Sequence, residues 1–192
     1  MWVYQDPSGA VMISNSTTTL GIVQATIGTD AMVGSSLALV PFEVANKRTD
    51  YKLFYQDNDS NLARRSWSSA GLDTNNATGH GWTDSQPLGS VAPGASIAAL
   101  AYGQMADVAS SATQTMQIIN TIPGSAYFNV TTWANQWTGP RQPSGMHPTG
   151  TFSEVAAVSH GEVFAITNGS IAQYAVADDG VTWGFVGYVP TK

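Results

Sequence analysis

The sequence predicts an all-β protein, a β-propeller built from four-stranded antiparallel sheets, or blades. One observation is a repeat: segments that run strand, short turn, strand, tryptophan and glycine recur along the 192 residues. Their spacing of roughly 40–50 residues is typical of propeller blades. A second observation is that these segments alternate apolar and polar residues and are rich in β-branched and aromatic side chains, with almost no helical periodicity.

The repeats divide the chain into consecutive units. The clearest unit begins with Tyr51–Arg64, continues through Gly81-Trp82 and closes on Ser96–Leu100, and the first residues, from Trp2 to Ile13, repeat its opening. Counting in this way predicts about 3.5 blades in one propeller domain over residues 1–192. The predicted units are a half blade at residues 1–30 and full blades near 35–92, 95–148 and 151–192.

Turn signals separate the predicted strands within each unit. Asp6–Gly9, Asp57–Ser60, Asn168-Gly169 and Asp178–Gly180 have the residues that hairpin turns prefer. About 3.5 blades do not close a ring, and an open propeller would expose long unpaired strand edges. We therefore expect the chain to be the C-terminal portion of a longer protein, or a second fragment or copy to complete the propeller.

Composition excludes several classes of function. Thirteen acidic and seven basic residues give a net charge of −6, which disfavours nucleic acid as a partner. Apolar runs are all shorter than the roughly 20 residues that span a bilayer, so no membrane contact is predicted. Cysteine is absent, which excludes disulfides and a thiol nucleophile. The histidines His80, His147 and His160 are scattered, so neither a metal site nor any other cofactor is predicted.

Five Asn-X-Ser/Thr sites predict N-glycosylation, and with it a secreted protein or one of the secretory pathway. The five asparagines are Asn15, Asn58, Asn76, Asn129 and Asn168. The alternative is that these are simply polar turns rich in Asn, Ser and Thr.

Several of the repeated motifs match a known family. They are Lys52–Asp57, Leu62–Arg64, Gly81-Trp82, Ser96–Leu100 and Trp183–Thr191. In these motifs the chain resembles the fungal fucose-specific lectins, which are six-bladed propellers with sugar pockets between neighbouring blades. The resemblance implies six blades in the intact molecule. It also implies a sugar pocket made by an arginine that opens the second strand of a blade, a glutamate on the third strand, and an aromatic ring.

The residues of this sequence depart from that pocket. The arginine position falls on Met1, Lys52, about Met116, and Gly161 or Glu162. The glutamate position falls on Ile13, Arg64, about Phe128, and Gln173. No blade keeps both residues. Lysine lacks the two-pronged hydrogen-bonding geometry of arginine, and arginine in place of glutamate reverses the charge. The resemblance therefore implies that the sugar apparatus is absent or rebuilt in this part of the molecule.

Two sets of residues are candidate pockets. One is cationic and aromatic: Lys52 and Arg64 are candidate catalytic residues, and the candidate ligand-binding residues beside them are Arg65, Trp67, His80 and Trp82. The alternative for this set is a solvated edge, because adjacent residues of a strand face opposite sides. The other set is apolar and consists of Tyr102, Met116, Phe128 and Trp133. Such side chains suit an apolar ligand, or else fill the core.

These sets support competing functions. The first is a lectin-like propeller that binds apolar small molecules, at its most specific a fungal natural-product cyclase of the hetero-Diels–Alderase type. This specific form rests on an analogy between folds. Such a pericyclic reaction requires two reactants held face to face in an apolar pocket and no cofactor, and a Lys or Arg donor on a carbonyl oxygen would lower its barrier further. The alternative is a secreted carbohydrate-binding lectin of altered, fucose-like specificity. A third is a scaffold that binds a protein partner.

Overall fold

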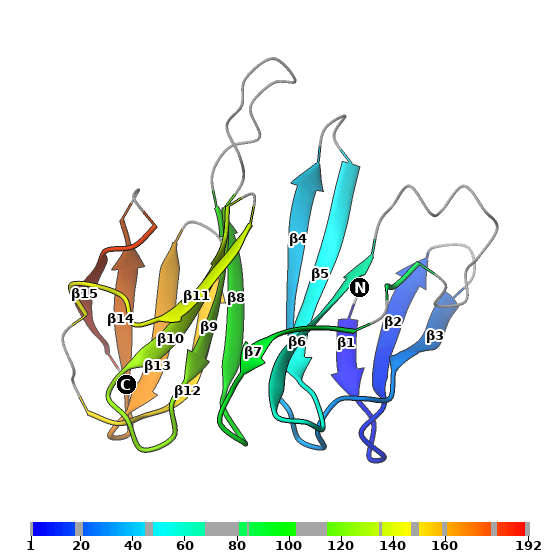
Figure 1. The fold of residues 1–192 in the computed structure, drawn as a ribbon, viewed down its shortest axis with the longest axis horizontal. Coiled ribbons are helices and arrows are strands. Elements are labelled where there is room, and N and C mark those ends of the chain that lie inside the picture. Colours follow the sequence, from blue (N-terminus) through cyan, green and yellow to red (C-terminus); the bar gives the residue numbers. More distant parts are fainter. Residues whose placement is uncertain are drawn as a thin grey trace. The chain divides into compact units, whose positions relative to one another are not determined.

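The protein consists of β-strands arranged in antiparallel sheets, and its described residues contain no helix (Figure 1). The computed structural model describes residues 2–17, 21–44, 48–67, 81–83, 85–102, 115–134, 136–146, 150–158, 161–177 and 180–190. This confirms the predicted fold class, an all-β chain built from four-stranded antiparallel sheets.

The strands fall into four sheets, and each strand pairs with its neighbour in the sequence. The first sheet consists of β1 (Trp2–Gln5), β2 (Val11–Thr17) and β3 (Gly21–Gly28). The second consists of β4 (Ala38–Val44), β5 (Arg48–Gln56), β6 (Asn61–Trp67) and β7 (Gln86–Ser90). The third consists of β8 (Ile97–Tyr102), β9 (Thr115–Thr121), β10 (Phe128–Trp133) and β11 (Trp137–Arg141). The fourth consists of β12 (Phe152–Val158), β13 (Glu162–Thr167), β14 (Ser170–Val176) and β15 (Trp183–Val189).

The N-terminal segment differs from the predicted half blade in one respect. The described part of residues 1–30 contains three strands, because β3 pairs along β2 from Gly21 to Gly28 and extends the β1–β2 hairpin. The sequence motif that predicted the half blade covers only β1 and β2. Sequence reasoning therefore found the hairpin and missed its third strand.

Aspartate side chains hold two of the hairpin turns in the same way. At the β1–β2 turn, Asp6 Oδ1 accepts hydrogen bonds from the backbone N–H groups of Ser8 and Ala10, at 2.8 and 2.9 Å. At the β5–β6 turn, Asp57 Oδ1 accepts from the N–H groups of Asp59 and Asn61, at 3.0 and 2.8 Å. These bonds fix the register of each hairpin, because the carboxylate accepts from backbone N–H groups of the turn that have no partner in the hydrogen bonds between the two strands.

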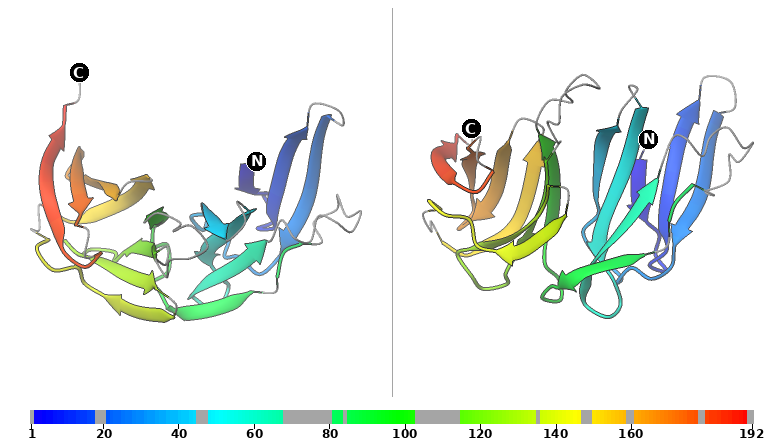
Figure 2. Two further views of the ribbon diagram at one scale, coloured as in Figure 1. Left: turned by 90° about the horizontal axis from the view of Figure 1, so that it is seen from above. Right: turned by 45° about the horizontal axis from the view of Figure 1, so that its top comes forward.

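The sheets group into two compact units, Met1–Ser90 and Val91–Lys192. In the first unit, the β1–β3 and β4–β7 sheets face each other (Figure 2). The core between them holds the buried residues Val11, Ile27, Ala31, Leu53, Tyr55 and Ala63. Val3 and Ile13 pack against this core from the first sheet, and Leu39 from the second. Alternation along the strands sends these side chains to one face of each sheet.

In the second unit, the β8–β11 sheet packs on the β12–β15 sheet. Phe128 of β10 is at the centre of this core. Its ring stacks on Phe152 at 4.3 Å and lies about 6 Å from the rings of Tyr174 and Trp183. Together with aliphatic residues of both sheets, these four aromatic side chains form a hydrophobic core cluster of the unit.

Candidate functional site

The two candidate catalytic residues, Lys52 and Arg64, lie on one face of the second sheet. Phe54 pairs with Arg64 across β5 and β6, and Lys52 stands two residues before Phe54, so alternation places both cations on the same side. Both side chains are half-buried. Arg64 Nη2 donates a hydrogen bond to Gln86 Oε1 on β7. Burial lowers the pKa of the Arg64 guanidinium from its ordinary value.

Arg65 lies on the opposite face, where it joins a polar network within the first unit. Its Nη2 donates to Asp30 Oδ1 at 2.7 Å, its Nε to the Tyr55 hydroxyl at 2.8 Å, and its Nη1 to the carbonyl of Thr83 at 3.1 Å. The Tyr55 hydroxyl in turn donates to Asp30 Oδ2 at 2.8 Å. A ligand would therefore compete with three protein acceptors for this guanidinium.

The network perturbs the ionisation of its members. Burial is the main cause that raises the pKa of Tyr55 to about 12, and the hydrogen bond to Asp30 adds to it. Burial alone would raise the pKa of Asp30, but hydrogen bonds from Arg65 and Tyr55 outweigh it and lower that pKa. Burial would also lower the pKa of Arg65, and its bonds to Asp30 and Tyr55 raise it instead. Near neutral pH the network holds a charged Asp30–Arg65 pair and a neutral tyrosine.

Gly28 provides the room for this network. A Cβ atom at Gly28 would lie 2.8 Å from Arg65 Nε and 2.9 Å from Asp30 Oδ1, closer than side chains approach. The guanidinium therefore packs directly against the backbone of β3. A larger residue at position 28 would displace the Asp30–Arg65 pair.

The aromatic residues of the cationic candidate set pack within the first unit. Trp67 and Trp82 are joined by an isolated antiparallel bridge, and the ring centroid of Trp67 lies 5.6 Å from that of Tyr51. Trp82 packs against the core between the first two sheets. Trp67 shares a face with Arg65, opposite Lys52 and Arg64, so the structure divides this set between the two faces of the sheet. His80 lies outside the described residues.

The apolar candidate set is divided in the same way. Met116 and Trp133 are cross-strand partners on β9 and β10, so they share a face. Phe128 pairs with Thr121 and points to the other face, where it is 0% exposed in the core of the second unit. Tyr102 ends β8, and its side chain lies outside the described residues. Met116 and Phe128 therefore do not line one common pocket.

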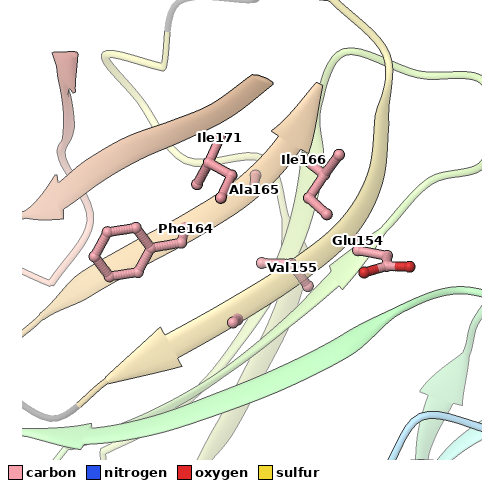
Figure 3. Close-up of a pocket in the computed structure, with 7 residues that line it drawn as sticks. Glu154, Val155, Phe164, Ala165, Ile166 and Ile171 are labelled. Carbon is pink, nitrogen blue, oxygen red and sulfur yellow. The ribbon is translucent and has the colours of Figure 1, made fainter. Parts of the chain in front are cut away.

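A hollow that the candidate sets do not include lies on the exposed face of the fourth sheet (Figure 3). Its volume is about 190 Å³. The face alternates along each strand, and its cross-strand pairs are Glu154 with Ile166, Ala156 with Phe164, and Ile166 with Ile171. Figure 3 shows Glu154 beside Ile166 at one end, with Phe164 further along β13. Val155 and Ala165, on the core side of the same strands, complete the lining.

A polar pair adjoins this hollow. Gln173 of β14 is the cross-strand partner of Phe164, and its Nε2 donates to Glu162 Oε1 at 3.2 Å. Alternation places Glu162 on the same face as Phe164, two residues away on β13. The face thus combines a carboxylate, an amide and an aromatic ring. The family resemblance places the arginine of the sugar pocket at Gly161 or Glu162 and its glutamate at Gln173, so the pair lies at or beside those positions.

Sequence reasoning missed the apolar part of this face. The alternation from Glu162 to Ile166 predicted a strand, yet alternation alone does not say which of its two faces a neighbouring sheet covers. The face with Val163 and Ala165 is covered, and the face with Phe164 and Ile166 is exposed to a greater degree.

The remaining predictions concern glycosylation, metals and membranes. Asn58 and Asn168 are exposed in hairpin turns, and Asn129 is half-buried on β10. The Asn15 side chain and Asn76 lie outside the described residues, and glycosylation and secretion stay predictions. Across the ranges that the structure describes, no three His, Asp or Glu side chains cluster closely enough to hold a metal ion. No helix in those ranges is long and apolar enough to cross a membrane.

Neither a protein-family model nor a curated protein matches the chain in sequence. Solved structures do match in three dimensions. The fungal lectin of Aleuria aurantia, described as a six-bladed β-propeller with a novel mode of fucose recognition, matches with a TM-score of 0.71 and 15% identity. This match covers 99% of this chain and 59% of the lectin. AofleA from Arthrobotrys oligospora matches with a TM-score of 0.75 and 12% identity, over 99% of this chain and 53% of its own.

The chain therefore spans a little over half the length of the structures it resembles. Identities of 12–15% carry the fold alone. That fold is the one the sequence motifs indicated: this chain has the architecture of a partial lectin-like β-propeller, similar to the fungal fucose-specific lectins.

Proposed function

We propose that this chain is part of a carbohydrate-binding propeller of the lectin type, with a specificity different from that of fucose lectins. The fold supports the class of function, because solved structures that match over nearly the whole chain include fungal lectins. The observation that carries the proposal to a site is the Glu162–Gln173 pair beside Phe164 on the fourth sheet.

The chemistry of this trio suits a sugar. A carboxylate accepts charge-assisted hydrogen bonds from neighbouring hydroxyls, and a glutamine amide offers both a donor and an acceptor. An aromatic ring packs on the apolar C–H face of a sugar ring. Glu162 and Gln173 are half-buried, so they are held in place but remain within reach of a ligand.

The same trio supports an altered specificity. The resemblance implies arginine at position 161 or 162 and glutamate at position 173, and with the arginine position at 162 this sheet has Glu162 and Gln173 instead. A fixed donor is thus replaced by an acceptor, and the fixed acceptor by an amide that does either. A sugar whose hydroxyls accept from arginine would lose that bond here, and one that presents hydroxyl donors would gain one.

Binding of an apolar small molecule is a second candidate, favoured by the side chains of Phe164, Ile166 and Ile171 around the hollow. The volume of about 190 Å³ is below the roughly 300–1,000 Å³ of pockets that enclose an organic ligand. Lys52 and Arg64 do not line the hollow. No feature of the described residues adds support for cyclisation chemistry.

The test is a glycan array followed by calorimetric titration of the best ligand. Glu162→Gln and Gln173→Ala should each weaken binding about 10-fold or more, because the first removes the charge of the acceptor and the second removes the hydrogen-bonding amide beside it. Phe164→Ala should also weaken binding, while Asp59→Asn, an exposed acid-to-amide change in the β5–β6 turn, should leave it unchanged. The absence of any glycan ligand, or equal affinity in all four variants, would contradict the proposal. Binding of an apolar dye that Phe164→Ala alone abolishes would favour the second candidate.

A further inference from the structure

The second sheet carries positive charge on the face that points away from the sheet before it in the sequence. Leu53 and Tyr55 of β5 pack toward the first sheet. Lys52 and Phe54 alternate with them and point the other way, and Phe54 pairs with Arg64 across β5 and β6. This face therefore carries a phenylalanine with two cationic side chains on neighbouring positions.

The fourth sheet repeats this arrangement with the charge reversed. Val163 and Ala165 of β13 pack toward the third sheet. Glu162 and Phe164 alternate with them, and Phe164 pairs with Gln173 across β13 and β14. The residue two positions before the phenylalanine is thus a carboxylate here and an amine in the second sheet. The cross-strand partner of the phenylalanine is a neutral amide here and a guanidinium there.

The sequence of the fourth sheet adds to its negative charge. Residues 151–190, which contain the whole sheet, include four acidic residues and no lysine or arginine. Two of the acids are on the exposed face, namely Glu162 and Glu154, which is the cross-strand partner of Ile166. Ile166 follows Glu162 by four residues along β13, a distance of about 13 Å at the rise of a strand. The two carboxylates therefore lie at opposite ends of an apolar strip that includes Phe164 and the hollow of Figure 3.

We infer that the ligand of this face carries a positive charge and, because the inference rests on the proposed function, that it is an amino sugar with a protonated amine. An ammonium group has N–H donors and no acceptor, so its natural partner is a carboxylate. Gln173 Nε2 donates to Glu162 Oε1 at 3.2 Å, and this bond orients the carboxylate on the sheet. The ring of Phe164 adds to the attraction, since a cation is drawn to the face of an aromatic ring.

Neutral and acidic sugars fit this face less well. A hydroxyl group donates to a carboxylate without a charge of its own, so its bond is weaker than that of an ammonium. A sugar with a carboxylate or a sulfate would bring a second negative charge beside Glu162, and such like-charge contacts oppose binding. Glu162 is half-buried, which strengthens both effects, because salt and water screen a partly buried charge less than an exposed one.

Glu154 extends the inference from a single amino sugar to a chain of them. It is too far from Glu162 for one amine to contact both carboxylates. A chain of amino sugars carries one amine on each unit, so it can place one amine at Glu162 and another near Glu154. Two contacts made by one ligand reinforce each other. Glu154 is exposed, so its contribution is the smaller of the two.

The test compares three tetrasaccharides that differ in one substituent of each unit. They are the β-1,4-linked tetramer of glucosamine, its N-acetylated form and the corresponding tetramer of glucose. Calorimetric titration at low salt and about pH 6, where amines of this type are protonated, should show that the glucosamine tetramer binds about 10-fold more tightly than either of the others. Its advantage should shrink as salt approaches about 1 M, where the Debye length is about 3 Å.

Three variants locate the charge that produces this preference. Glu162→Gln keeps the size of the side chain and removes its charge, so most of the preference for the amine should be lost. Glu154→Gln should weaken binding of the glucosamine tetramer about 2- to 5-fold, as expected for an exposed ion pair, and leave binding of the glucosamine monomer unchanged. Asp59→Asn, the matched control in the β5–β6 turn, should keep the full preference. Urea unfolding of each variant checks that it is folded.

The outcomes separate this inference from the proposed function. If the N-acetylated or glucose tetramer bound as tightly as the glucosamine tetramer, or if Glu162→Gln kept the preference, the inference would fail and the proposed function would stand. An oligolysine peptide that bound as tightly as the glucosamine tetramer would overturn the assignment to a sugar, because the face would then recognise any cation. If no glycan of any charge bound, both the proposed function and this inference would fail.

Discussion

The hydroxyl of Tyr55 is the centre of the polar network in the first unit, and removing it alone tests that network. Tyr55→Phe keeps the buried ring but removes the acceptor for Arg65 Nε and the donor to Asp30 Oδ2, both at 2.8 Å. Gly28, beneath Arg65, leaves the guanidinium little space to rearrange. Two charged groups thus each lose one partner but keep the ion pair between them at 2.7 Å.

The expected cost follows from these bonds. A hydrogen bond to a charged group contributes about 1.5–3 kcal/mol. Asp30 is a third exposed, and solvent screens and partly replaces what it loses, so the discounted expectation is about 1–2 kcal/mol at neutral pH. Urea unfolding followed by tryptophan fluorescence should show this as a lower midpoint with an unchanged slope.

Alkaline pH gives the same substitution a second signature. Tyr55 has a pKa of about 12 in the folded protein, against an ordinary value of 10.0. Between these values the unfolded chain releases the proton while the folded chain retains it, so the contribution of Tyr55 is complete below pH 10 and is lost as pH rises towards 12. Tyr55→Phe should lack this part of the alkaline loss of stability, and one tyrosine that ionises near pH 12 should disappear from the absorbance titration of the folded protein.

The control is Tyr4→Phe, which removes the hydroxyl of an exposed tyrosine in the same unit. It should change stability by less than about 0.5 kcal/mol. The network would not have the assigned role if Tyr55→Phe cost no more than Tyr4→Phe. A Tyr55→Phe variant with the same alkaline loss as the wild type would refute the ionisation argument.

Two further predictions concern the backbone and the ion pair. Gly145→Ala should lower the free energy of unfolding in urea more than Gly94→Ala does. Both glycines have φ of +74°, so the backbone strain is alike. A Cβ at Gly145 would lie 2.7 Å from the Trp183 carbonyl oxygen, whereas a Cβ at Gly94 would meet open space. About 1 kcal/mol is expected at Gly94 and about 2–3 kcal/mol at Gly145, and equal costs would show that the clash is relieved. Arg65→Met should destabilise the protein near neutral pH, and its difference from the wild type should shrink as pH falls below 3.8, because the lowered pKa of Asp30 stabilises only while that carboxylate is charged. If the stability difference between Arg65→Met and the wild type stayed the same in acid, Arg65 would stabilise the protein through packing and not through its ion pair.

Much of the fold was predictable because its signals are local. The alternation in β5, β13 and β14 and the turns at Asp6 and Asp57 appear within short windows of sequence, and they position the strands correctly. The candidate site was less predictable. Alternation along β6 separates the adjacent Arg64 and Arg65 onto opposite faces, but it does not show that Arg65 pairs with the distant Asp30. The exposure of Ile166 likewise depends on which sheet packs where, and a strand pattern does not contain that information.

The aspartate turns have a consequence for how such a molecule is divided between chains. Asp6 and Asp57 each set the register of their own hairpin from within that hairpin, and every strand pairs with its neighbour in the sequence. The residues that determine the strand pairing of each sheet therefore lie in one continuous segment of the sequence. A break between two sheets, or a duplication of one, leaves every strand pairing intact. Propellers of this type can thus gain, lose or share blades in evolution by changing only the surfaces between sheets.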